Sequence, residues 1–246
     1  MNGQTPNYPT KIKRWYKKWW GVVILIILAI FLIFGSAITF QVAQILWKFN
    51  KGEITVEEII GKSTNDLDEI RKKVESTDDP FLGPKDAPVT IVEFGDFACP
   101  ITKQMVPVLK QLRELYPQQV KIIYRDYPIV SQDSITAANA AACAYEQGAP
   151  IFWTFHDQLF AGQDNLTEDN MVAIAKNMGI NTQRFYQCFT ARTHQKEIKE
   201  DMDTGLNLNL KGTPVFFING NMVTGLQPIE SWKKAIDYLI KQNAIK

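Results

Sequence analysis

The chain has 246 residues, with 27 lysine and arginine residues against 26 aspartate and glutamate residues. Proteins that bind nucleic acids through their phosphates are usually strongly basic, so this balance of charges argues against that class. Three cysteines are too few for a small fold held together by disulfides. The length predicts one globular domain with additional segments.

A basic segment followed by an uncharged one opens the chain. Residues 1–19 carry five lysine or arginine residues and no acid, and residues 20–47 carry no charge. About 20 apolar residues in a helix cross a bilayer, and basic flanks stay in the cytoplasm. We therefore expect a cytoplasmic tail over 1–19, a transmembrane signal anchor over 20–47 and an extracytoplasmic C-terminal part. A signal peptide cleaved near residues 35–37 and a buried core helix remain alternatives.

Residues 48–83 mix apolar and charged side chains and are expected to form a solvated stalk with one or two helical turns. Proline and glycine at Asp78-Asp79-Pro80 and Gly83-Pro84 indicate its end. The folded domain is therefore expected to begin near Pro84.

A strand, a helix and a second strand are predicted next, over residues 89–94, 99–116 and 120–124, with Pro107 inside the helix. This order is a βαβ unit. Cys99 lies at the first strand-to-helix junction, where unpaired N–H groups and the positive end of the helix dipole stabilise a thiolate. A thiolate is the nucleophile of disulfide exchange, so Cys99 is the first candidate for a catalytic residue.

Helices dominate the next segment, and strands return after it. Helices are predicted over 134–148, 151–160, 167–179, 183–191 and 193–206. Residues 215–218 then predict a strand, Asn219-Gly220 a hairpin turn, 222–223 the returning strand and 229–242 a last helix. This order predicts an α/β domain over 84–130 and 207–246, with a helical domain inserted over 131–206.

The remaining cysteines and the histidines offer fewer indications. Cys143 and Cys188 lie in separate predicted helices, and an oxidising compartment favours a structural disulfide between them. Two reduced cysteines, or a resolving role toward Cys99, remain alternatives. We expect His156 to lie in the core among aromatic residues and His194 to be solvated. The two histidines are distant in sequence and there is no CxxC pair, so we expect no metal site. The sequence has no glycine-rich phosphate loop before a helix, so we expect no cofactor.

Four stretches of the sequence resemble the DsbA-like branch of the thioredoxin superfamily. They are Gly83–Pro88, Phe94–Pro100, Cys143–Gly148 with Phe152-Trp153 and His156-Asp157 after it, and Gly212–Gly220. The resemblance covers roughly residues 84–242. It implies a thioredoxin-like α/β fold with an inserted helical domain, here preceded by the predicted transmembrane helix.

The same resemblance implies an extracytoplasmic thiol-disulfide oxidoreductase in which Cys99 attacks. Pro214, preceded by Thr213, takes the place of the family's cis-proline that faces the sulfur, and these residues and Pro100 are expected to contact the substrate. Glu93 matches the family's buried acid beneath the sulfur, where a carboxyl relays protons. A simple pairing of Glu93 with a residue such as Arg125 is the alternative.

Thr102 stands where the family has its second active-site cysteine, which gives the motif Cys-Pro-Ile-Thr. Threonine cannot close an intramolecular disulfide, although its hydroxyl can donate a hydrogen bond to the Cys99 thiolate. We therefore expect a single-cysteine enzyme that forms mixed disulfides, resolved by a second thiol. Its expected partners are exported proteins with thiols or disulfides and a membrane redox partner, without nucleic acid. A catalytically inactive, membrane-anchored binding or chaperone module is the alternative.

Overall fold

The computed structural model describes residues 64–76 and 78–243, together with five single helical residues of the N-terminal segment: Trp19, Val23, Ile26, Ile27 and Ile30. Most of the predicted tail and anchor, and residues 48–63 of the predicted stalk, lie outside the described residues. Within the described part of the chain, no helix is both long and apolar enough to span a bilayer. The chain divides into units of residues 1–51 and 52–246, and the second is described below.

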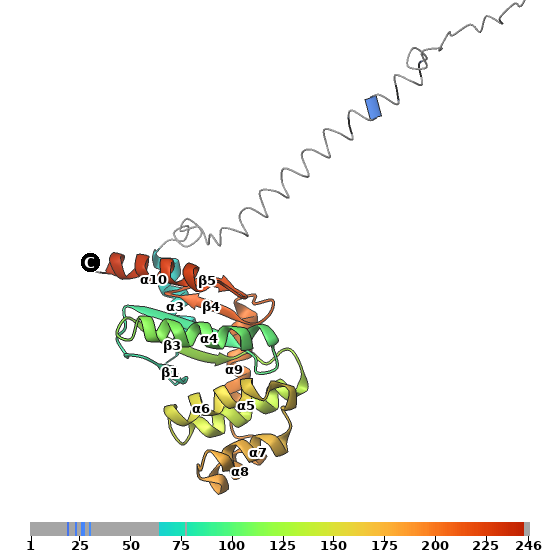
Figure 1. The fold of residues 1–246 in the computed structure, drawn as a ribbon, viewed down its shortest axis with the longest axis vertical. Coiled ribbons are helices and arrows are strands. Elements are labelled where there is room, and N and C mark those ends of the chain that lie inside the picture. The colour runs from blue at the N-terminus through green and yellow to red at the C-terminus, as the bar shows by residue number, and fades with distance from the viewer. Residues whose placement is uncertain are drawn as a thin grey trace, which may run out of the picture. The chain divides into compact units, whose positions relative to one another are not determined.

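A five-stranded sheet in the order β1-β3-β2-β4-β5 forms the centre of this unit (Figure 1). The strands are β1 (Phe81–Leu82), β2 (Val89–Gly95), β3 (Val120–Asp126), β4 (Val215–Ile218) and β5 (Asn221–Thr224). β2 and β3 run parallel, and the other neighbours run antiparallel. Helix α4 (Pro100–Leu115) connects β2 to β3, which confirms the predicted βαβ unit. Asn219 and Gly220 have φ of 45° and 84°, the positive values that a two-residue hairpin turn requires.

Helices cover both faces of the sheet. α4 and α10 (Ile229–Asn243) bury Met105, Leu109 and Trp232 against one face. The other face packs against α3 (Thr64–Val74) and against the region of α9 (Gln195–Asn207) and the loop after it. Both layers exclude water from the central strand β2, whose seven residues are all buried. The end of β2 is therefore a rigid support for the residues that follow it.

The inserted helices form their own apolar core beside the sheet. They are α5 (Gln132–Tyr145), α6 (Ala149–Ala161), the short 3-10 helix η2 (Gln163–Asn165), α7 (Glu168–Asn177) and α8 (Thr182–Ala191). A disulfide joins Cys143 in α5 to Cys188 in α8, with Cα atoms 5.7 Å apart and a sequence separation of 45. Cross-linking a loop of this length stabilises a fold by roughly 2–4 kcal/mol. His156 lies in this core, as expected, in ring contact with Phe97 and Tyr124.

The folded unit begins before Pro84. Leu67, Ile70 and Val74 recur at helical spacing in α3, and Val74 is completely buried in the cluster that contains Val92 and Phe94. β1 pairs with β3. Residues 64–82 are therefore part of the folded unit rather than of a stalk. Their many charges obscure the single apolar stripe of α3, and a two-residue strand leaves almost no sequence pattern.

Candidate active site

Cys99 lies where β2 gives way to α4 and caps the first turn of that helix. Its side chain faces the loop before β4: the Sγ atom donates a hydrogen bond to the carbonyl oxygen of Thr213 at 3.2 Å. The peptide bond between Thr213 and Pro214 is cis. The fold thus brings together two segments 114 residues apart, in the arrangement expected from the sequence. Cys99 is 6% exposed and is the free cysteine of the chain.

The first turn of α4 favours negative charge on the sulfur. Cys99 precedes a proline at the start of the helix, and the turn contains no acidic residue. The helix N-terminus carries about half a positive charge, which attracts an anion at the N-cap position. No carboxylate in that turn opposes this attraction, so the position suits a nucleophilic thiolate.

Glu93 lies on β2, opposite Tyr124 of β3, and is 1% exposed. Neither carboxyl oxygen has a hydrogen-bond partner among the described residues. Burial, and to a lesser extent the charge of Cys99, raise the pKa of Glu93 to about 8. At neutral pH the carboxyl is therefore protonated, and its proton is coupled to the charge of Cys99.

Arg125 does not pair with Glu93. Successive side chains of a strand point to opposite faces, and Arg125 is one position beyond Tyr124, the residue opposite Glu93. Its guanidinium instead pairs with Asp79, at 3.2 Å, and with Asp201. The alternative interpretation of Glu93 as an ion-pair partner of Arg125 is therefore wrong.

Two further buried groups, on α4 and on β3, have no hydrogen-bond partner among the described residues. Thr102 is completely buried, and its hydroxyl has no hydrogen-bond partner in the described part of the chain. The expected hydrogen bond from Thr102 to the sulfur is thus absent from this arrangement. The hydroxyl of Tyr124 is also buried and unpartnered, and burial, ahead of nearby acids, raises its pKa well above the usual value. Buried polar groups are normally hydrogen-bonded, so the unpartnered groups of Glu93, Thr102 and Tyr124 indicate a role other than stability.

Two residues that the sequence did not single out hold the Cys99 loop in place. The carboxylate of Asp96 accepts hydrogen bonds from the backbone N–H groups of Ala98, Ile129 and Val130, each at 2.8 Å. Gln163, in η2, donates its side-chain N–H groups to the carbonyl oxygen of Cys99 at 2.9 Å and to that of Phe97 at 2.8 Å. The bond from Asp96 to the N–H two residues later is an Asx turn, which its sequence position allows one to predict. The long-range bonds leave no local signal.

We expect Asp96→Asn to destabilise the protein by about 2–3 kcal/mol, because hydrogen bonds to a charged group contribute about 1.5–3 kcal/mol each. The asparagine amide has only one oxygen, so it can accept hydrogen bonds either from Ala98 or from Ile129 and Val130. Its NH₂ group then faces backbone N–H donors on the other side, with which it cannot form hydrogen bonds. Urea denaturation measures the loss, and hydrogen exchange at Ile129 and Val130 reports it locally. Asp86→Asn, in an exposed turn, is the matched control. Equal stability of the two variants would contradict the bracing role of Asp96.

A separate cleft of about 610 Å³ runs along the later turns of α4, and its lining includes Val106, Arg113, Trp153 and Phe81. Cys99 does not line it, so the cleft is distinct from the site described here.

The family model Thioredoxin_4, described as thioredoxin, matches residues 75–238. The probable disulfide bond formation protein D of Bacillus cereus is 32% identical over 171 residues, covering 65% of this chain and 78% of that protein. The Na⁺/H⁺ antiporter NhaA 3 of Salinispora tropica is 34% identical over 180 residues, which are 72% of this chain and 27% of the antiporter. The chain therefore spans about a quarter of that antiporter's length.

Solved structures agree with this assignment. BdbD from Bacillus subtilis, in its oxidised form, has a TM-score of 0.62 and 25% identity, covering 70% of this chain and 95% of that chain. The thiol-disulfide exchange protein alpha-DsbA2 from Wolbachia pipientis has a TM-score of 0.68 over 76% of this chain and 100% of that chain, and at 22% identity it supports the fold alone. The chain belongs to the DsbA-like family of thioredoxin-fold thiol-disulfide oxidoreductases.

Proposed function

We propose that this protein exchanges disulfides with exported proteins through Cys99 alone. The observation that carries the proposal is the placement of Cys99 at the N-terminus of α4, with its sulfur 3.2 Å from the carbonyl oxygen of Thr213 in the loop before β4. An extended substrate that lies along the Thr213 backbone brings its own disulfide to this sulfur. Pro100, Thr213 and Pro214 are then the substrate-contacting residues.

The exchange proceeds in two balanced steps. The Cys99 thiolate attacks one sulfur of a substrate disulfide, which forms a mixed disulfide and releases the other substrate sulfur as a thiolate. Thr102 has no sulfur with which to resolve this intermediate. A second thiol, from the substrate or from a small thiol compound, attacks the mixed disulfide and returns Cys99 to its thiolate form. A net reduction needs two thiols from outside the chain, whereas an isomerisation needs none.

The buried carboxyl of Glu93 supplies a proton store for these steps. With its pKa raised to about 8, it is protonated at neutral pH. It gives up that proton most readily while the sulfur is uncharged in the mixed disulfide, because the charge of Cys99 is one of the causes that raise its pKa. Glu93 thus acts on the reacting sulfur by holding and releasing a proton.

We also propose that the catalytic domain is extracytoplasmic and anchored in the cell membrane by residues 20–47, whose uncharged composition and basic flank favour this orientation. In that location a membrane redox partner can supply electrons. The disulfide between Cys143 and Cys188 is consistent with an oxidising compartment.

A non-catalytic binding module is the competing proposal, and the low exposure of Cys99, 6%, is the observation in its favour. Trapping distinguishes the two. Acid quenching protonates thiolates and halts exchange, so mixed disulfides survive isolation of the full-length protein. We expect covalent partners that reducing agents release and that disappear in Cys99→Ala. Partners that remain bound to Cys99→Ala would instead support the binding module and contradict the enzyme.

We expect Thr102→Cys to give the protein dithiol activity that the parent lacks. Residues three apart on a helix have neighbouring side chains, about 5–6 Å between Cβ atoms, within reach of a disulfide after adjustment. Turnover of a dithiol peptide with a small oxidant measures the gain. Thr102→Ser is the matched control, since it keeps a hydroxyl without adding a thiol. If Thr102→Cys is folded and alkylated at Cys99 yet shows no turnover, the α4 N-terminus is not a competent redox site.

A further inference from the structure

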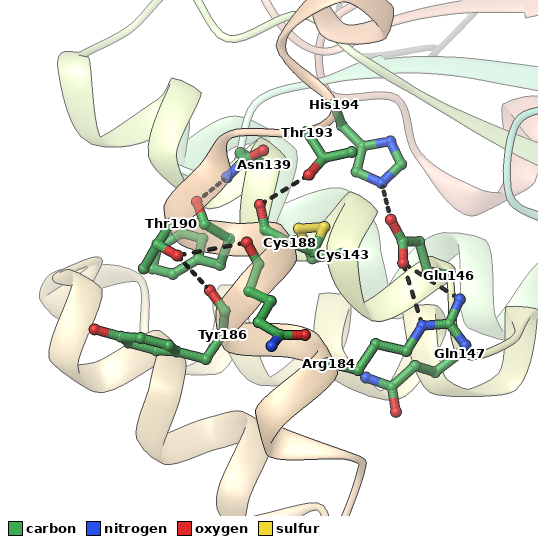
Figure 2. The surroundings of a disulfide bond; sticks show 12 residues. Asn139, Cys143, Glu146, Gln147, Arg184, Tyr186, Cys188, Thr190, Thr193 and His194 are labelled. Carbon is green, nitrogen blue, oxygen red and sulfur yellow. Dashed lines mark hydrogen bonds and ion pairs between the residues drawn. A yellow bond between two sulfur atoms is a disulfide. The ribbon is translucent and has the colours of Figure 1, made fainter.

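The disulfide of the inserted helices has an unusual neighbour. His194, in the turn before α9, offers a ring nitrogen that lies, with the sulfur atoms of Cys143 and Cys188, in a group whose members are all within 4.8 Å of one another. Figure 2 shows the ring beside the disulfide, with the Glu146 carboxylate below it. The sequence alone separates these residues across three helical segments, so it predicts no such group. The fold assembles it.

The carboxylates around His194 are arranged like those of a metal-binding histidine. Its Nδ1 lies 2.7 Å from Glu197 Oε2, and its Nε2 lies 3.0 Å from Glu146 Oε1. A ligating histidine commonly uses one ring nitrogen for the metal and is oriented by a carboxylate on the other. Glu197 supplies that orienting carboxylate. Arg184 holds the second oxygen of Glu146 at 3.3 Å, which leaves Oε1 to face the histidine (Figure 2).

We propose that reduction of the Cys143–Cys188 disulfide creates a zinc site from both thiolates and His194, the three groups that lie together. Glu146, which is bonded to the histidine ring, moves in as the fourth ligand. Two sulfur ligands, one imidazole and one carboxylate are a donor set that Zn²⁺ accepts in tetrahedral geometry. The Cα atoms of the cysteines, 5.7 Å apart, already place two side chains on one centre. The metal replaces the hydrogen bond between His194 and Glu146, and Glu197 keeps the ring in orientation.

The conversion is balanced with a dithiol as the reductant. One of its thiolates attacks the sulfur of Cys188, because Cys188 is 7% exposed and Cys143 is completely buried. Cys143 leaves as a thiolate and takes up a proton from solvent. The second thiol of the reductant closes its own disulfide and releases Cys188. Binding of Zn²⁺ then displaces the two thiol protons. Exposure of His194 and Glu146, 18% and 26% for their side chains, gives the ion a route from solvent.

Cobalt binding to the full chain tests this site independently of the proposed function. Cys99→Ser removes the remaining thiol, a phosphine reduces the disulfide, and alkylation with mass measurement verifies two free thiols. We expect one Co²⁺ per reduced chain, with thiolate charge-transfer and tetrahedral ligand-field absorption, displaced by Zn²⁺. The oxidised chain should bind none. Zinc should also raise the melting temperature of the reduced chain and leave that of the oxidised chain unchanged.

Matched variants distinguish a metal site that includes His194 from binding of the metal by the two thiols alone. Loss of an orienting carboxylate weakens metal binding by about 10- to 100-fold, so we expect that loss for Glu197→Gln and a larger one for His194→Ala. Glu200→Gln, on the exposed side of α9, should bind as the parent does. Four results would overturn the proposal: a disulfide that resists the phosphine under native conditions, no cobalt bound, equal binding by the oxidised chain, or equal binding by His194→Ala.

Discussion

Replacing Arg125 with methionine is expected to lower the free energy of unfolding by about 3–5 kcal/mol, because removing one member of a buried ion pair leaves its partners uncompensated. The guanidinium pairs with Asp79 at 3.2 Å and with Asp201, and both carboxylates are themselves buried. It also donates to the carbonyl oxygen of Lys73 at 2.9 Å. Arg125 thus connects the end of α3, strand β3 and helix α9 on the sheet face opposite Cys99.

The loss should grow with pH. Burial, and then the charge of Asp201, raise the pKa of Asp79 to about 7 even with Arg125 opposing them. Because this pKa lies above the unfolded value of about 3.9, protonated Asp79 contributes stability that is present below about pH 4 and lost as the pH rises through 7. Without Arg125 the folded pKa rises further, so the deficit of the variant is larger at pH 8 than at pH 5.

Urea denaturation at both pH values measures these losses. Arg113→Met, on the exposed side of α4, is the matched control and should change stability by no more than about 0.5 kcal/mol. If Arg125→Met were as stable as this control at pH 8, the ion-pair cluster would not hold α3 and α9 to the sheet.

Local patterns predicted the elements that surround Cys99. The β-branched run of β2 and the apolar spacing of α4 each contain enough residues to fix the type of element. The Asn219-Gly220 pair specified the hairpin through its backbone conformation alone. By contrast, β1 has two residues, and its existence depends on pairing with β3 some 40 residues later. Its sequence therefore has no pattern that could reveal it.

Contacts between distant segments were the least predictable part of the site. His194 was expected to be solvated because its neighbours in sequence are charged, yet it is bonded to Glu146, 48 residues earlier. Those bonds, that to Glu197 first, raise its pKa above the usual value although burial opposes them. Gln163 likewise reaches Cys99 across 64 residues. Such contacts depend on how the helices pack, and a single sequence carries no record of that.

Between pH 5 and pH 8, the stability of the Glu93→Gln variant should fall much less than that of the parent. The carboxyl has a pKa of about 8 in the folded chain, against about 4.3 in an unfolded chain. Protonated Glu93 therefore contributes stability that is fully present below about pH 4 and lost as the pH rises through 8. At 1.36 kcal/mol per pH unit over most of that interval, its share of the decline is on the order of 4 kcal/mol. Glutamine cannot ionise, so this share vanishes.

The same substitution should simplify the reactivity of Cys99. An ionised Glu93 opposes a thiolate nearby, because the charge of Cys99 raises the pKa of Glu93 and the interaction is mutual. The rate of Cys99 alkylation in the parent should therefore respond to the ionisation of Glu93 near pH 8, and in Glu93→Gln this response should be absent. Urea denaturation at pH 5 and pH 8 gives the stability difference on the same samples. Glu114→Gln, exposed on α4, should match the parent in both measurements. If Glu93→Gln kept the response near pH 8 and the full decline in stability, the buried carboxyl would not be the proton store of Cys99.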